Sequence, residues 1–193
     1  SDESKPKNLT TAEKKEVFAT SKGWVREAGS ILSGNDNTSA TPEVLVAIGD
    51  LAGSSSTTGL RAPTVTSMRF VKGTTATTDL TAADSTARIL VEITYDEAVT
   101  VVGSPQVVVA NNNASGGGFG NYTLTYTATG STANRIRFEA TSQSLGNTDV
   151  LTLGGSNISL NSGTISDTAV GGTTLAASLA LDGISAVAVT IAS

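Results

Sequence analysis

From residue 65 onward, the chain alternates apolar and polar side chains in short runs. Every second residue of 89–95 is Ile, Val or Tyr, and 122–127 and 135–140 show the same period of two. Successive side chains of a β-strand point to opposite faces, so each run predicts a strand with one buried face. Shorter apolar runs predict further strands at 65–71, 106–110, 150–153, 158–160, 175–181 and 184–191.

Turn-forming residues separate these runs. Gly, Asn, Asp and Ser recur between them at intervals of about 8–12 residues, which is typical of all-β sandwiches. Helical periodicity is absent from residues 63–193. The sequence therefore predicts an all-β fold, with an antiparallel two-sheet β-sandwich over residues 61–193.

The N-terminal part has a different texture. Thr10 and Glu13 have the spacing of a capping box, which predicts one or two helical turns behind Thr10. The β-branched segment 44–48 favours a strand over a helix that begins at Pro42. This strand is expected to pair with residues 24–25 as a loose hairpin.

A Ser/Gly/Thr-rich linker at residues 53–59 marks the expected domain boundary, because such segments bury too little apolar surface to order themselves. Residues 1–60 are then an extended N-terminal arm. A segment of about 50 residues with few large apolar side chains cannot build its own core, so the arm must dock on another surface. The lone Trp24 fits either a small core or an anchor on a partner. The predicted partner interface of the arm comprises Val17, Phe18, Trp24, Val25, Val44, Leu45, Val46 and Ile48.

Composition narrows the classes of function. The chain has no His and no Cys, and 12 Lys and Arg stand against 17 Asp and Glu, a net charge of −5. These counts exclude a Ser–His–Asp triad, a thiol nucleophile and a zinc site with the usual ligands. The negative charge argues against nucleic-acid binding. We expect no enzyme, no cofactor and no metal.

Charge and hydropathy are distributed unevenly. Six cations and five acids precede residue 28, whereas six cations and twelve acids follow residue 27, which suggests two segments with different roles. No run of about 18 apolar residues is present, so we expect no membrane insertion. The hydrophilic first residues lack the apolar region of a signal peptide.

Several polar groups are candidates for chemistry. Asp96 and Glu97 are adjacent carboxylates suited to acid–base work or Ca²⁺, but a solvated strand end is the favoured interpretation. Asp167 is either a metal ligand or the first residue of an Asx turn. The segment 34–37 offers oxygen ligands without the calcium-loop spacing, so a turn is favoured.

Two further motifs have simpler explanations. The Gly-rich segment 116–120 precedes a strand, whereas a phosphate-binding loop precedes a helix, so we expect an ordinary loop there. Arg135 and Arg137 share one face of their strand with Glu139, which favours cross-strand charge pairs. Two arginines do not make a nucleic-acid face.

Three stretches carry a resemblance to a known family. They are residues 89–105 (ILVEITYDEAVTVVGSP), residues 121–127 (NYTLTYT) and residues 158–167 (ISLNSGTISD). In this order they resemble the bacterial Ig-like repeats of surface-layer and cell-surface motility proteins. The resemblance covers residues 63–192 and implies an Ig-like sandwich. Such domains serve as spacers, adhesive modules and virion decorations.

The segment 23–48 resembles N-terminal regions of structural proteins from marine tailed phages. This second resemblance implies a capsid decoration or cement protein at the virion surface. Its expected partners are the major capsid protein or another virion protein, symmetric copies of the chain itself and, weakly, the host surface. The alternative is an Ig-like adhesin or surface-layer module of a secreted bacterial surface protein.

Overall fold

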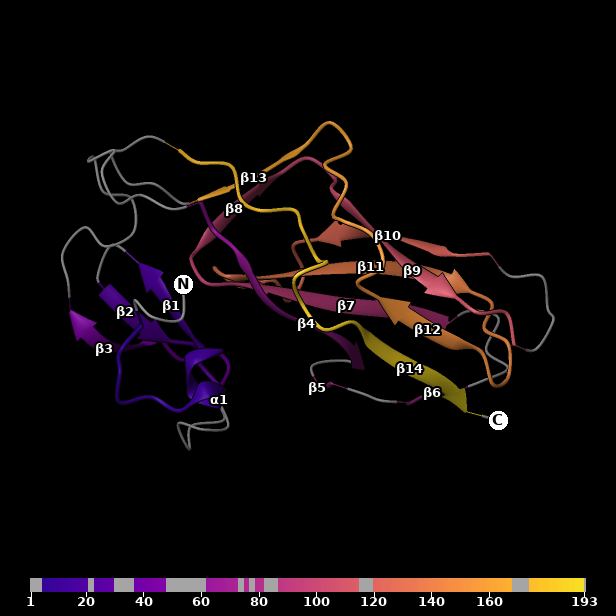
Figure 1. The fold of residues 1–193 in the computed structure, drawn as a ribbon, viewed down its shortest axis with the longest axis horizontal. Helices are drawn as coiled ribbons and strands as arrows, with labels where there is room; N and C mark the ends of the chain where they lie inside the picture. The colour runs from indigo at the N-terminus through magenta and orange to yellow at the C-terminus, as the bar shows by residue number, and fades with distance from the viewer. Residues whose placement is uncertain are drawn as a thin grey trace. The chain divides into compact units, whose positions relative to one another are not determined.

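Strands make up nearly all the regular structure of the described residues (Figure 1). We analysed a computed structural model. It describes residues 5–20, 23–29, 37–47, 62–72, 75–76, 79–81, 87–114, 120–167 and 174–192. The predicted linker at 53–59 lies outside these residues, as do positions 34–36 of the segment 34–37 and most of the Gly-rich segment 116–120.

The predicted helix start at Thr10 is confirmed. Helix α1 (Thr11–Lys14) begins with a complete capping box, in which Glu13 N donates to Thr10 Oγ1 over 3.3 Å and Thr10 N donates to Glu13 Oε2 over 2.8 Å. The hydrogen bonds from the backbone and side chain of Thr10 lower the pKa of Glu13. A single turn has no stability of its own, so it depends on the cap and on neighbouring segments.

A small antiparallel sheet follows this helix. Its strand order is β1-β2-β3, and its strands are β1 (Val17–Thr20), β2 (Gly23–Arg26) and β3 (Glu43–Ala47). The predictions of a strand rather than a helix at 44–47 and of a hairpin with Trp24-Val25 are confirmed. Trp24 pairs with Val46 and Val25 with Val44, so Leu45 is the extra residue of a β-bulge.

The chain divides into two compact units. Unit 1 spans Ser1–Thr66, Tyr95–Val101 and Ile165–Ser178, and unit 2 spans Ser67–Thr94, Val102–Thr164 and Leu179–Ser193. The N-terminal segment is therefore not an extended arm, because it forms a small sheet within a unit that includes two later segments. A two-stranded sheet pairs β8 (Val99–Val102) with β13 (Thr164–Asp167), where a turn was expected.

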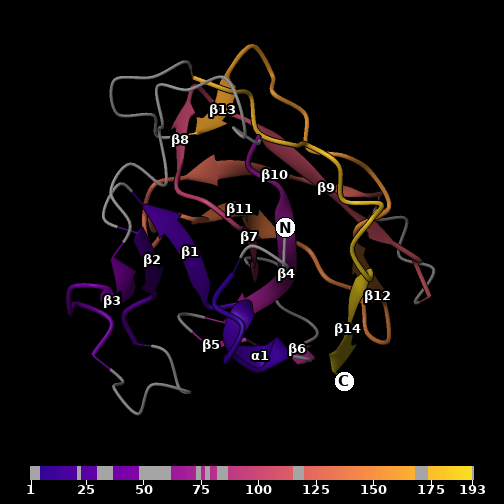
Figure 2. The ribbon, with the colours of Figure 1, turned by 60° about the vertical axis from the view of Figure 1, so that its left-hand side comes forward.

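The main sheet is one continuous surface of mostly antiparallel strands. Its order is β5-β4-β7-β11-β10-β9-β12-β14-β6, with β6 and β14 parallel. The seven longer strands form a nearly closed barrel, and Figure 2 shows the sheet curling from β4 to β14. The strands are β4 (Val65–Lys72), β5 (Thr75–Ala76), β6 (Asp79–Thr81), β7 (Ala87–Tyr95), β9 (Gln106–Asn111), β10 (Tyr122–Thr127), β11 (Arg135–Gln143), β12 (Val150–Leu153) and β14 (Val187–Ala192).

The prediction of an Ig-like sandwich is wrong in its architecture. A barrel and a sandwich both bury alternate residues, so a period of two predicts the strands without deciding whether two sheets face each other or one sheet curls. The run at 158–160 contributes only an isolated bridge from Ser159 to Gln106, and 175–181 contributes one from Ala176 to Ser166. Both segments are otherwise irregular.

The core of the main sheet lies on its inner face. Val91 pairs with Phe138, and Ile93 pairs with Ile136, all of them buried, as the alternation predicted. The same face continues onto β10, where Leu124 pairs with Val107 of β9.

The outer face of the same strands carries a buried charge. Glu92 of β7 is 0% exposed. Its Oε1 accepts from Arg69 Nε over 3.0 Å and from Arg69 Nη2 over 2.7 Å, and its Oε2 accepts from Arg137 Nε over 3.2 Å. Arg135 Nε lies 3.5 Å from the same oxygen. Because β4, β7 and β11 are neighbours in the sheet, this cluster joins three strands through one carboxylate.

Replacing Glu92 by Gln is expected to destabilise the fold by about 3 kcal/mol, because the arginines lose the anion that holds them together. Glu139→Gln is the matched control. Glu139 lies on β11 and pairs with Arg88 over 2.6 Å, but both side chains are partly exposed, so its loss costs about 1 kcal/mol or less. Urea unfolding of the two variants measures the difference. Equal losses of stability would show that the Glu92 cluster is not a structural centre.

Candidate functional site

The small N-terminal sheet contains most of the predicted partner-interface residues. Val17, Phe18, Trp24 and Val25 are all buried in the chain itself, and Trp24 is only 7% exposed. Val17, Ala19 and Trp24 form a small cluster. Of the two roles considered for Trp24, this position corresponds to the small core.

Strand β3 holds the exposed part of the predicted interface. Val44 is 45% exposed and Val46 is 38% exposed, whereas the bulged Leu45 packs against the Trp24 cluster. Ile48 lies outside the described residues. The surface available to a partner is therefore the edge of the sheet formed by β3, and the buried members of the set lie on the strands next to it.

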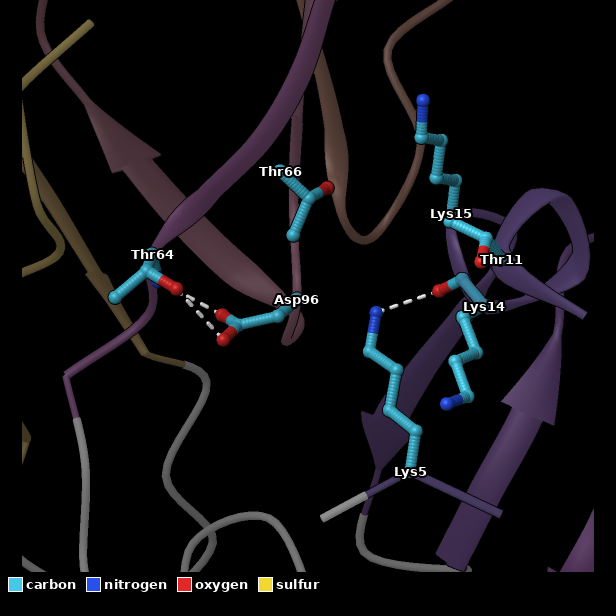
Figure 3. Close-up of a pocket in the computed structure, with 7 residues that line it drawn as sticks. All are labelled: Lys5, Thr11, Lys14, Lys15, Thr64, Thr66 and Asp96. Carbon is cyan, nitrogen blue, oxygen red and sulfur yellow. Dashed lines mark hydrogen bonds between the residues drawn. The ribbon is translucent and has the colours of Figure 1, made fainter. Parts of the chain in front are cut away.

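A polar cavity lies elsewhere in unit 1 (Figure 3). Its volume is about 210 Å³, which is below the roughly 300–1,000 Å³ of common ligand pockets. Lys5 is buried, and its ammonium donates to the Lys14 carbonyl oxygen over 2.6 Å. The lining residues are Lys5, Thr11, Lys14, Lys15, Thr64, Thr66 and Asp96.

The Asp96 carboxylate, in the wall of this cavity, accepts two hydrogen bonds from Thr64. Its Oδ1 accepts from Thr64 N and its Oδ2 from Thr64 Oγ1, each over 2.7 Å, as the dashed lines in Figure 3 show. Its backbone oxygen also accepts from Ala19 N over 3.3 Å. Asp96 directly follows β7, as a strand-end residue should. The expectation that it is solvated is wrong, because Asp96 is only 5% exposed and both of its carboxylate oxygens accept hydrogen bonds from Thr64.

Glu97 has an altered acidity. Burial, together with the carboxylates of Asp96 and Asp167, raises the pKa of Glu97 to about 7. Asp167 Oδ1 accepts from Leu175 N over 2.8 Å, so this oxygen holds the chain that follows β13. Within the described ranges, no group of three His, Cys, Asp or Glu residues is arranged to hold a metal ion.

Sequence reasoning missed two features of the site. The pairing of Thr64 with Asp96 spans 32 residues, and nothing near either residue predicts it. Lys5 belongs to the hydrophilic N-terminal run, yet its side chain is buried. The expectation of cross-strand charge pairs for Arg137 and Glu139 is confirmed, since Arg137 pairs with Glu92 and Glu139 pairs with Arg88, both between β11 and β7.

Comparison of the chain with protein-family models, with curated proteins and with solved structures finds no match. The described part of the chain also contains no helix with the length and hydrophobicity needed to cross a bilayer. Any functional inference therefore depends on the residues of this chain.

Glu97→Gln is expected to flatten the pH dependence of stability. The folded-state pKa of Glu97 is above its ordinary value of 4.5, so the protonated form favours folding. This contribution is fully present below the unfolded pKa and is lost as the pH rises through about 7. The Gln variant stays neutral at this position. Its Tm should therefore fall less between pH 5 and pH 8 than the Tm of the wild type.

Differential scanning calorimetry at several pH values gives this comparison. Glu43→Gln, on the exposed strand β3, removes the same formal charge and serves as the control. Parallel Tm profiles for the wild type and Glu97→Gln would contradict the assignment of this pH dependence to Glu97.

Proposed function

We propose that this chain is a non-enzymatic structural protein of a virion, a capsid decoration or cement protein that docks through its N-terminal sheet. The observation that carries the proposal is the exposure of Val44 and Val46 on β3, a strand whose described pairing is with β2 alone. The resemblance of segment 23–48 to phage structural proteins supports the same role. The proposed location is the virion surface.

The proposed contact is made by strand addition and by apolar burial. An edge strand presents backbone donors and acceptors in a row, and a partner strand can pair with them. Full burial of a valine contributes roughly 1.5–3 kcal/mol, so these two half-exposed side chains supply a modest affinity. Symmetric copies on a lattice convert modest single-site affinity into avidity.

The buried residues have a supporting role in this proposal. Phe18 pairs with Val25 and Val25 with Val44, so a continuous row crosses the sheet behind the docking edge. A preformed sheet loses less conformational entropy on docking than an extended arm would. The partner is the major capsid protein or another virion protein.

Localisation in the source culture separates this proposal from the alternative. An antibody against the chain is used to follow it through density-gradient fractions of lysed culture. Co-migration with DNA-containing particles, with regular surface labelling in electron micrographs, supports a decoration protein. Co-migration with cell envelopes instead would reject it in favour of the adhesin or surface-layer module.

The double variant Val44→Asp/Val46→Asp is expected to abolish rebinding to particles stripped of the protein, because two carboxylates would be buried without partners. The single variant Val102→Asp is the matched control, since Val102 is 59% exposed and lies outside the N-terminal sheet. Sedimentation with stripped particles measures binding, and circular dichroism checks folding. Unchanged rebinding by the folded double variant would show that β3 is not the docking strand.

A further inference from the structure

The charge cluster around Glu92 is unbalanced. Three guanidinium groups, those of Arg69, Arg135 and Arg137, surround one carboxylate. The three guanidinium groups carry three positive charges, whereas the carboxylate carries one negative charge. A buried Glu needs one well-placed Arg for compensation, so the cluster carries more positive charge than Glu92 requires.

These arginines share the outer face of the main sheet. Arg137 is directly opposite Glu92, and Arg135 is opposite Thr94, so the side chains alternate with the core residues of β11. The pair of Arg88 with Glu139 lies next to them and is neutral as a whole. Among the described side chains, Glu92 and its three arginines therefore have a net charge of +2.

This concentration is local to the face. Six cations follow residue 27, and three of them are the arginines of this cluster, whereas twelve acids are spread over the same stretch. The Arg69 side chain is 41% exposed, whereas the Arg135 and Arg137 side chains are 20% and 11% exposed, so solvent reaches the cluster mainly at Arg69. An anion that approaches unit 2 meets positive charge here.

The loop before β11 holds Arg137 in place. Gly130 has φ +75°, and a Cβ at this position would overlap Nη1 of Arg137. Ser131 Oγ accepts from Arg137 N over 2.9 Å. The positive φ of Gly130 favours glycine in this turn, and the Arg137 guanidinium itself is held by Glu92. A guanidinium that is held before binding loses little entropy when it meets a ligand.

We propose that the outer face of β4, β7 and β11 binds the sulfate or carboxylate groups of an acidic polysaccharide. The planar donor fork of arginine matches both groups. Nucleic acid fits less well, because its dense phosphate charge calls for a wide basic surface, and a net +2 on a chain of net −5 does not provide one. The proposal is independent of docking through β3.

The test is a titration of the ¹⁵N-labelled full chain followed by NMR, with arginine Nε–Hε and backbone signals observed. The probes are a heparin-derived hexasaccharide, which carries sulfates and carboxylates, an oligogalacturonate hexasaccharide, which carries only carboxylates, and uncharged maltohexaose. Shifts confined to β4, β7 and β11 with the charged probes, and none with maltohexaose, are expected. Binding by oligogalacturonate identifies carboxylates as sufficient, and binding by the heparin fragment alone identifies sulfates.

Variants then assign the contact to the arginines. Arg135→Gln and Arg69→Gln are each expected to weaken binding about tenfold, as loss of a charge-assisted hydrogen bond does. Lys7→Gln removes the same charge from an exposed site and should change affinity less than about twofold. Arg69→Lys keeps the charge but loses the fork, so it should bind more weakly than the wild type.

Three results would overturn the proposal. They are no shift with either charged probe, shifts centred on the lysine-lined cavity of unit 1, and equally tight binding of a DNA duplex of similar charge. Because the NMR map uses the unaltered chain, it remains decisive even where an arginine variant fails to fold. If the localisation experiment rejects the virion assignment, the NMR result for the arginine face still stands.

Discussion

The end of strand β7 holds unit 1 together. The Tyr95 hydroxyl donates to the Ser178 carbonyl oxygen over 3.1 Å, and the Asp96 carboxylate accepts twice from Thr64. Burial raises the pKa of Tyr95, which keeps its hydroxyl a donor. Ala19 joins the same point through the Asp96 backbone. Segments remote in sequence therefore meet at two residues, and the small N-terminal sheet depends on them.

This junction explains which parts of the fold the sequence could predict. Alternation in 89–95 and 135–140 predicted β7 and β11 because it is a local consequence of strand geometry, and the Thr10 capping box predicted α1 for the same reason. Whether the strands form one curled sheet or two facing sheets depends on long-range pairing, which alternation does not encode. The Ig-like resemblance led to the sandwich, and the strand order corrected it.

The sequence predicted which apolar residues belong to the N-terminal sheet, but not which of them the chain buries. The apolar character of Val17, Trp24 and Val44 indicated contact surfaces without saying which side chains the chain would bury itself. The bulge at Leu45 decides this for β3, because it turns that side chain toward the Trp24 cluster while Val44 and Val46 stay exposed. A bulge depends on the register with β2, and so it is invisible in the strand's own sequence.

Deleting residues 1–60 is a poor probe of docking, because it would also damage the rest of unit 1. The deletion would remove Ala19 and with it a hydrogen bond to Asp96, whose carboxylate orders Thr64 inside the remaining chain. A loss of binding would then mix a missing surface with a damaged unit 1. Substitutions on β3 separate the two, because Val44 and Val46 lie in no buried cluster. The arginines around Glu92 belong to unit 2, so the two proposed surfaces can be altered independently.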